Sequence, residues 1–216
     1  MNTVDLIKKH RFIAIFRHID PVYAADAAQA VYDGGVRLFE ITFDPSKPNT
    51  IKETQQIIKT IIGLFGDDVC VGAGTVIKQE FAEAAYEAGA RFIVSPCTNE
   101  GIIRYTKEHG MASLPGAYTA SEIMRAYELG ADIVKIFPIA PDQIGYLKNI
   151  ISPLSHIPFI PTGGINPDTI DVFMELGAAA VAAGASVVTQ QLCESGEYER
   201  IRENAARHTA AAAKYV

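Results

Sequence analysis

Residues 37–44 are Arg37-Leu38-Phe39-Glu40-Ile41-Thr42-Phe43-Asp44, a stretch in which two kinds of side chain alternate. Successive side chains of a β-strand point to opposite faces, so Phe39, Ile41 and Phe43 share one apolar face. The other face carries Leu38, Glu40, Thr42 and Asp44. A parallel strand covered by helices on both sides is apolar throughout, so this pattern predicts that the polar face lines the inside of a closed barrel.

A second stretch, residues 131–138, has the same alternation: Ala131-Asp132-Ile133-Val134-Lys135-Ile136-Phe137-Pro138. Ile133, Lys135 and Phe137 share one face, and Val134 and Ile136 share the face that we expect to pack against helices. The pattern therefore predicts a lysine that points into the barrel.

Short runs rich in β-branched and aromatic residues recur along the chain, each followed by a segment of helical composition. The predicted strands are 11–17, 37–43, 69–75, 91–95, 112–115, 133–137, 159–162 and 179–183. Eight such units fit either a barrel or a long doubly wound sheet. A repeated glycine ending (86–90, 127–131 and 174–178) and the absence of Gly-x-Gly-x-x-Gly after the first strand favour a (β/α)8 TIM barrel. Residues 197–215 are Ala-rich and are expected to form a closing helix.

The composition limits the class of partner. The chain has 216 residues, is 49% apolar and lacks a linker-like run, which predicts one domain over residues 1–216. The net charge is −6 with no basic block, so we expect a small-molecule partner, no nucleic acid and no membrane. Three separated cysteines, the charged residues 8–11 and the lack of a long apolar run favour the cytoplasm.

Lys135 is the strongest candidate for a catalytic group. Desolvation inside a barrel disfavours the charged ammonium and lowers its pKa, and a neutral amine is a nucleophile. The alternative is a rim lysine whose ammonium reaches water, but Pro138 ends the strand only three residues later and the neighbours on both sides are apolar.

Glu40 and Arg17 are the charged residues expected beside this amine. Glu40 either neutralises Lys135 or moves the protons that imine and enamine formation require. Arg17 ends the first strand on the face of Ile13 and Ile15, so it either binds a substrate anion or forms a surface ion pair.

Three small-residue segments, 71–75, 161–165 and 182–186, end predicted strands. The last two follow the seventh and eighth strands, where barrels often bind phosphate through backbone N–H groups. The alternative is that Gly163 and Gly164 only turn the chain into a helix near Asn166 and Pro167.

Four segments, 35–42, 71–75, 135–138 and 161–165, together resemble the 2-keto-3-deoxy-6-phosphogluconate (KDPG) and 4-hydroxy-2-oxoglutarate (KHG) aldolases, including the 6-phosphogalactonate (KDPGal) branch. The resemblance implies that Lys135 forms the carbinolamine and Schiff base with pyruvate and that Glu40 shuttles protons. It also implies that Thr75 and Thr162 contact the keto acid. The phosphate contacts that it implies are Gly163, Gly164, Gly184 and Ser186. A homotrimer, with no metal and no cofactor, is implied in the same way.

Two positions depart from the family pattern. The gluconate branch carries arginine two residues beyond Glu-x-Thr, where it helps to hold the keto-acid carboxylate, and here that position is Asp44. An acid there would repel a carboxylate, so Arg17 or Lys47 is expected to take over. The Ser-Pro-Gly of the family is Ser-Pro-Cys97 here.

The predicted function is reversible cleavage of a 4-hydroxy-2-keto acid to pyruvate and an aldehyde such as glyceraldehyde 3-phosphate or glyoxylate. The candidate substrates are 2-keto-3-deoxy-6-phosphogluconate, its galactonate counterpart and 4-hydroxy-2-oxoglutarate. One alternative is a metal-dependent keto-acid lyase with Glu40 and Asp44 as ligands, although the five histidines show no metal-binding spacing. Another is a phosphosugar-binding barrel without catalysis.

Overall fold

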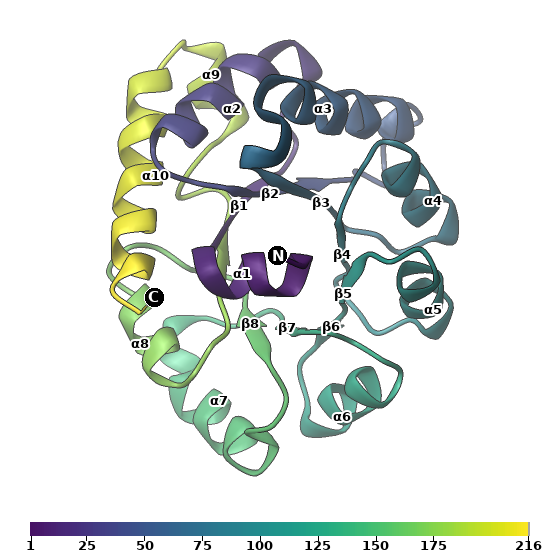
Figure 1. Ribbon diagram of the computed structural model, residues 1–216. Helices are drawn as coiled ribbons and strands as arrows, with labels where there is room; N and C mark the ends of the chain where they lie inside the picture. The colour runs from purple at the N-terminus through teal and green to yellow at the C-terminus, as the bar shows by residue number, and fades with distance from the viewer. Residues whose placement is uncertain (216) are drawn as a thin grey trace.

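The computed structural model describes residues 1–215 and shows a ring of parallel strands surrounded by helices (Figure 1). The strands are β1 (Phe12–Phe16), β2 (Leu38–Thr42), β3 (Cys70–Gly74), β4 (Phe92–Val94), β5 (Ala112–Leu114), β6 (Gly116–Ala117), β7 (Val134–Ile136), β8 (Phe159–Pro161) and β9 (Val181–Ala183). They pair in two sheets, β5-β4-β3-β2-β1-β9 and β6-β7-β8, and a bridge between Thr162 and Ala182 joins β8 to β9. The predicted TIM barrel is confirmed.

All eight predicted strands are present, but the fifth is divided. β5 pairs with β4, and β6 pairs with β7, with Pro115 between the two segments. Proline has no backbone N–H to donate, so it interrupts a ladder. The Pro115 carbonyl still accepts a hydrogen bond of 2.9 Å from the Lys135 backbone N–H, which keeps β7 beside the divided strand.

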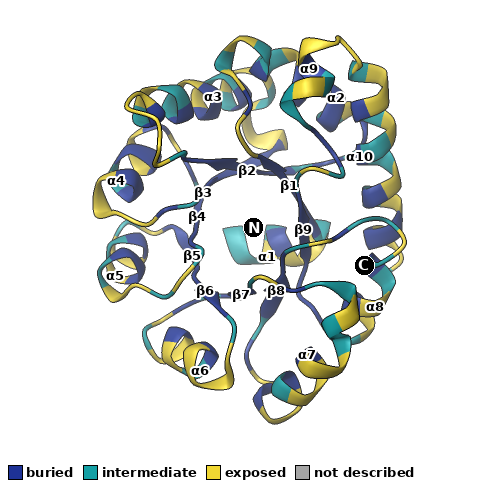
Figure 2. Ribbon diagram, turned by 180° about the vertical axis from the view of Figure 1, so that it is seen from behind, coloured by how far each residue is buried: buried dark blue, intermediate teal, exposed yellow. Residues whose placement is uncertain are grey.

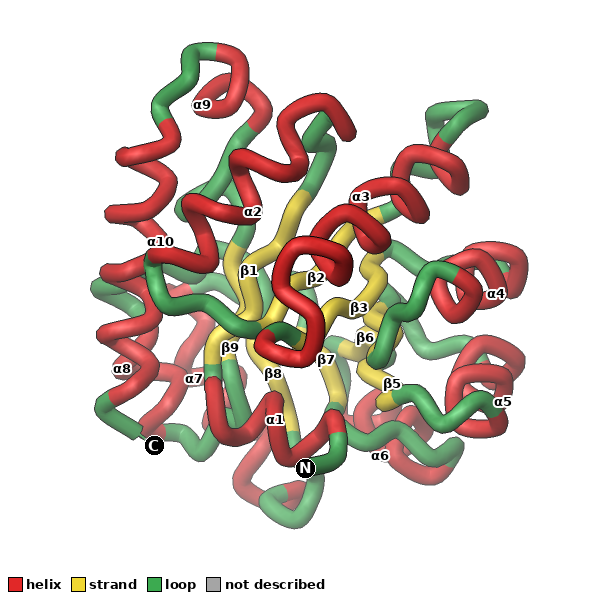
Figure 3. The backbone as a smooth tube through the Cα atoms, turned by 45° about the horizontal axis from the view of Figure 1, so that its top comes forward, coloured by secondary structure: helices red, strands yellow, loops and turns green. Residues whose placement is uncertain are grey.

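All but one of the α-helices of residues 1–215 surround the ring on its outside, where Figure 3 draws them in red. They are α2 (Ala24–Asp33), α3 (Thr50–Phe65), α4 (Gln79–Glu87), α5 (Glu100–Glu108), α6 (Ala120–Glu128), α7 (Ile144–Ile151), α8 (Ile170–Glu175), α9 (Gln190–Glu194) and α10 (Tyr198–Ala213). The expected closing helix is α10, which packs against α2 and α8. A Cβ atom on Gly34 would lie 2.5 Å from Cβ of Ala205, so the α2–α10 approach depends on that glycine. Within residues 1–215 no helix is long and apolar enough to cross a membrane.

One helix, α1 (Thr3–His10), was not predicted, and it covers one end of the ring (Figure 1). Its N-cap, Asn2, accepts a hydrogen bond from the Asp5 backbone N–H, and basic residues 8–10 occupy its last turn, where the helix dipole favours positive charge. Ile7 is fully buried in the barrel interior. The apolar contact of Ile7 therefore decides where this charged segment lies.

The core has two layers, as the alternation predicted. Figure 2 shows the strands buried and the helices buried on one side only. Phe39, Ile41, Val134 and Ile136 belong to the layer between strands and helices, whereas Ile13, Leu38 and Ile133 belong to the layer inside the barrel. Gly72 makes room for the ring of Phe92 inside the barrel, since a Cβ there would lie 2.2 Å from the ring. Apolar side chains thus fill the lumen below the polar groups.

Candidate active site

Lys135 on β7 and Glu40 on β2 meet inside the barrel. Lys135 is 4% exposed and Glu40 is 1% exposed, and Nζ lies 4.0 Å from Oε1. The amine also lies 5.0 Å from the centre of the Phe137 ring. The two side chains that strand alternation directed inward are therefore brought together from strands that are far apart in the sequence.

The surroundings of Lys135 favour the neutral amine. Burial lowers the pKa of Lys135, the Glu40 carboxylate acts in the opposite direction, and the positive charge of Arg17 lowers the pKa further. Burial is the largest of these effects. A lysine in this state keeps its lone pair for attack on a carbonyl carbon.

Two buried side-chain oxygen atoms have no hydrogen-bond partner among residues 1–215: Oε1 of Glu40, beside Lys135, and Oγ1 of Thr162, which follows β8. Buried polar atoms are nearly always satisfied, so two such atoms at one site indicate a place for a polar ligand. Glu40 packs directly against Gly74, where a Cβ atom would lie 2.1 Å from Oε1. The glycine at this position therefore makes space for the carboxylate.

A pocket of about 540 Å³ opens at the carboxyl ends of β1, β8 and β9. It brings together six residues predicted from the sequence, Arg17, Thr162, Gly163, Gly164, Gly184 and Ser186. Lys135 and Glu40 do not line it, but Phe137, whose ring centre lies 5.0 Å from the Lys135 amine, forms part of its wall. The pocket thus extends from Phe137, which lies beside the buried amine, to the glycine-rich loops.

The glycines of the pocket have backbone conformations that side chains would obstruct. Gly163 has φ +126°, and a Cβ atom there would lie 2.8 Å from the Ile139 carbonyl oxygen. Gly164 has φ +59°, and a Cβ on Gly184 would lie 3.3 Å from the Ile15 carbonyl oxygen. The loops after β8 and β9 can therefore approach an oxyanion closely.

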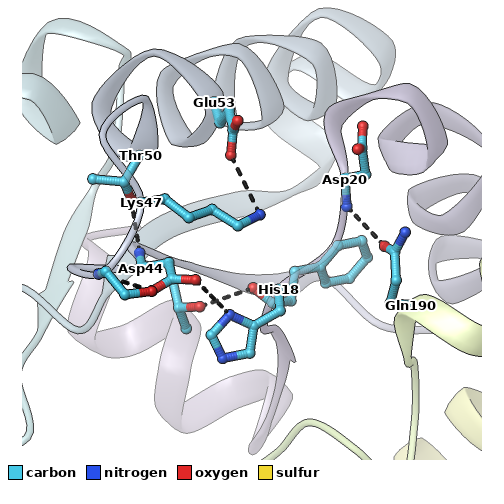
Figure 4. A network of polar contacts seen from close by, with 10 residues as sticks. His18, Asp20, Asp44, Lys47, Thr50, Glu53 and Gln190 are labelled. Carbon is cyan, nitrogen blue, oxygen red and sulfur yellow. Dashed lines mark hydrogen bonds and ion pairs between the residues drawn. The ribbon is translucent and has the colours of Figure 1, made fainter.

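Thr75 and Asp44 lie elsewhere. Thr75 follows β3 with φ +57° and is not part of this pocket. The inference that Asp44 lines the lumen is wrong, because Asp44 lies beyond the end of β2, where its Oδ1 accepts hydrogen bonds from Ser46 and its Oδ2 lies 3.1 Å from Nδ1 of His18 (Figure 4). The Ser46 hydrogen bonds, followed by the His18 contact, lower the pKa of Asp44. Asp44 is therefore an ionised rim residue.

Lys47, the other candidate for the role of the missing arginine, does not line the pocket. Its Nζ lies 3.7 Å from Oε2 of Glu53, and Figure 4 shows the side chain directed to that carboxylate.

Within residues 1–215 no group of three or more His, Cys, Asp or Glu side chains is arranged to hold a metal. Cys97 lines a neighbouring pocket together with Gly116 and Phe137.

Sequence reasoning missed two histidines. His18 lines the pocket in a left-handed conformation, φ +57°, which is uncommon for a residue with a side chain and has no marker in a single sequence. His208 on α10 is buried and contacts the hydroxyl of Ser186 at 2.9 Å. The sequence did contain a signal for the burial of His208, because it lies on one face of the helix with Ile201, Ala205 and Ala212.

Comparisons with known proteins agree with this geometry. A family model described as KDPG and KHG aldolase matches residues 4–204. The 2-dehydro-3-deoxy-6-phosphogalactonate aldolase of Escherichia coli (strain K12) is 34% identical over 81% of this chain and 83% of that protein. A solved structure titled native KDPGal structure has a TM-score of 0.83 and 31% identity, covering 94% of this chain and 95% of that one. The KDPG aldolase of Legionella pneumophila, with pyruvate captured as a covalent carbinolamine, has a TM-score of 0.84 and 26% identity, covering 96% of this chain and 98% of that one.

Fold, buried amine and relatives thus define a class I aldolase, a lyase that works through a Schiff base on lysine. The chain belongs to the KDPG and KHG aldolase family. Membership of this family favours a Schiff-base lyase over the two alternatives, a metal-dependent lyase and a barrel without catalysis.

Proposed function

We propose that the chain reversibly cleaves a phosphorylated 4-hydroxy-2-keto acid, 2-keto-3-deoxy-6-phosphogalactonate or its gluconate counterpart, to pyruvate and glyceraldehyde 3-phosphate. The observation that carries this proposal is the buried Lys135–Glu40 pair behind Phe137, in the wall of a pocket that Gly163, Gly164 and Gly184 also line. One end suits a keto group and the other suits a phosphate. The similarity to KDPGal and KDPG aldolases supports the same substrate class.

In the proposed reaction the neutral Nζ of Lys135 attacks C2 of the keto acid and forms a carbinolamine. Loss of water gives a protonated imine. Glu40, through a water molecule, removes the proton of the C4 hydroxyl, the C3–C4 bond breaks, and its electron pair neutralises the iminium as an enamine. The aldehyde leaves, Glu40 returns a proton to C3, and hydrolysis releases pyruvate and the free lysine.

The other predicted residues have binding roles in this proposal. Arg17 is exposed at the pocket and is the cation proposed to hold the keto-acid carboxylate in place of the arginine that Asp44 replaces. The hydroxyl of Thr162, which has no partner within residues 1–215, is proposed to bind the keto acid, and Thr75 is proposed to contact the same group from the end of β3. Gly163, Gly164, Gly184 and the backbone of Ser186 are proposed to hold the phosphate.

We also propose that residues 1–216 act as one domain, in a cytoplasmic homotrimer without a bound metal or other cofactor. The family resemblance supports the trimer and the absence of a metal, and the composition and the three separated cysteines support the single domain and the cytoplasm. Light scattering on the purified protein tests the trimer, and turnover after exhaustive chelation tests independence from metal.

Trapping tests the chemistry. Pyruvate with cyanoborohydride should attach one reduced pyruvyl group to the protein, and peptide mapping should place it on Lys135. Lys135→Arg is the matched control and should not be labelled. The proposal fails if the label lies elsewhere, or if an active enzyme takes up none. Pyruvate release from the galactonate-derived, gluconate-derived and unphosphorylated acids then identifies the substrate.

A further inference from the structure

His208 is a buried ionisable group that the proposed reaction does not use. It lies on α10, outside the barrel, with 1% of its surface exposed. Its ring stacks on Phe12 of β1 at a centroid distance of 5.1 Å. Burial of a histidine among apolar groups is unfavourable unless its ring nitrogens have partners, and both nitrogens of His208 have one.

His208 is connected to the pocket through its contact with Ser186. Nδ1 lies 2.7 Å from the Asn204 carbonyl oxygen, and Nε2 lies 2.9 Å from Oγ of Ser186. The same Oγ lies 2.9 Å from the Ile165 carbonyl oxygen. Ser186 and Ile165 both line the pocket, one on the loop after β9 and the other on the loop after β8. One imidazole therefore links α10 to both glycine-rich loops.

The three contacts of this chain can be made with a neutral or with a doubly protonated His208 ring, and the two states differ in the number of hydrogen bonds. A carbonyl oxygen only accepts, so the Asn204 contact requires a proton on Nδ1. In the neutral ring Nε2 then also accepts, and the single hydroxyl proton of Ser186 has two acceptors, Nε2 and the Ile165 oxygen. One contact is left without a proton. A doubly protonated ring supplies the missing donor, and all three contacts become hydrogen bonds.

The surroundings make the doubly protonated ring costly in the absence of a nearby anion. Burial, the largest effect, lowers the pKa of His208, the Asn204 hydrogen bond opposes it, and Arg207 on the same helix lowers it further. Phe12 faces the ring from β1 and Ser186 faces it from the loop after β9, and neither brings a negative charge. A dianion in the pocket, close to Ser186, would supply the missing counter-charge.

We propose that His208 is a positioning residue of the phosphate subsite, which fixes Ser186 against Ile165 and becomes an imidazolium when the substrate phosphate is bound. This inference rests on the proposed function, since it requires a phosphorylated substrate. In this arrangement the hydroxyl of Ser186 holds the two loops together, and backbone N–H groups of the loops donate hydrogen bonds to the phosphate. The positive charge of His208 acts on the phosphate from behind the loop.

Nitrogen NMR of the full chain, with histidine labelled in both ring nitrogens, tests the protonation. The probe is inorganic sulfate against chloride at equal ionic strength, because sulfate stays dianionic over the pH range used. The signals of His208 are assigned by their loss in His208→Gln. Sulfate should raise the titration midpoint of His208 and leave that of exposed His156 unchanged. Sulfate that competes with the phosphorylated substrate without moving the His208 midpoint overturns the proposal.

Two variants test the positioning role. His208→Asn keeps a donor near the Asn204 oxygen but does not reach Ser186, whereas the amide of His208→Gln reaches Ser186. Loss of one hydrogen bond should raise KM for the phosphorylated acid about tenfold in the asparagine variant, with most of it restored in the glutamine variant. The rate of pyruvate trapping on Lys135 should be the same in all three proteins.

The possible outcomes separate the two proposals. If the rate of pyruvate trapping falls by the same factor as KM for the phosphorylated acid rises, the role of His208 is purely structural. That result overturns the inference. If the asparagine variant does not fold, Ser186→Ala replaces it and should raise KM for the phosphorylated acid by about the same factor, with the rate of pyruvate trapping unchanged. Sulfate that neither binds nor inhibits the wild type removes the phosphate subsite and both proposals with it, while trapping on Lys135 would still stand.

Discussion

The Nζ atom of Lys135 lies 4.0 Å from Oε1 of Glu40, with 5% and 1% of the two side chains exposed. The separation exceeds that of a direct hydrogen bond, so the two groups interact by charge, while Oε1 has no hydrogen-bond partner in the described part of the chain. A small polar group between them would satisfy the carboxylate. The reaction we propose places a water molecule and the reacting hydroxyl there.

The lowered pKa of Lys135 predicts the pH dependence of imine formation. Because burial favours the neutral amine, the rate of pyruvate trapping should reach half its maximum at a pH below 10.5, the ordinary value for lysine. Mass spectrometry of the trapped protein across pH measures this. A midpoint at or above 10.5 would contradict it.

The same shift predicts a stability effect. The unfolded chain holds the Lys135 proton more tightly than the folded chain, so between the lowered pKa and the unfolded value of about 10.4 the free energy of unfolding gains a positive slope with pH. Below that interval the full cost of burying the ammonium is present, and above it the cost is gone. Lys135→Met should remove this slope in denaturant titrations, whereas exposed Lys148→Met should keep it.

Glu40→Gln should leave pyruvate trapping possible and lower kcat by about 10²–10⁴-fold, because the acid/base group is lost. Since the carboxylate raises the pKa of Lys135, its removal should also move the trapping midpoint to lower pH. Steady-state kinetics and the trapping profile measure the two effects. An unchanged kcat would exclude Glu40 as the proton carrier.

Arg17→Met should raise KM for keto acids about tenfold or more through loss of a charge-assisted contact, with a smaller effect on kcat. The positive charge of Arg17 lowers the pKa of Lys135, so the trapping midpoint should move to higher pH in this variant. Arg104→Met, on the exposed face of α5, is the matched control and should change neither value. If KM and the trapping midpoint are the same in both variants, Arg17 does not bind the substrate.

Gly163→Ala should lower the free energy of unfolding by about 1–3 kcal/mol and raise KM for the phosphorylated acid. The cause is a φ of +126° together with a Cβ position 2.8 Å from the Ile139 oxygen. Gly145→Ala in α7 is the control, because nothing lies within 4 Å of its Cβ position, and its stability should stay unchanged or rise by up to about 1 kcal/mol. Chemical denaturation compares them, and equal stabilities would contradict the prediction.

The alternation of residues 37–44 and 131–138 was sufficient to predict two strands, the faces they bury and the inward direction of Glu40 and Lys135. Side-chain direction along a strand alternates with a period of two residues, so the identities of a few consecutive residues are enough to predict it. The eight strand–helix units, the glycine-rich strand ends and the closing helix were predictable for the same reason, since each depends on a few consecutive residues.

The tertiary structure decided what depends on residues far apart in the chain. It determined the 4.0 Å between Lys135 and Glu40, the turn of Asp44 toward His18, and the contact between His208 and Ser186. It also divided the fifth strand at Pro115 and laid α1 across the end of the barrel. Loop paths and the packing of whole elements set these distances, and such non-local contacts have no period that a single sequence displays.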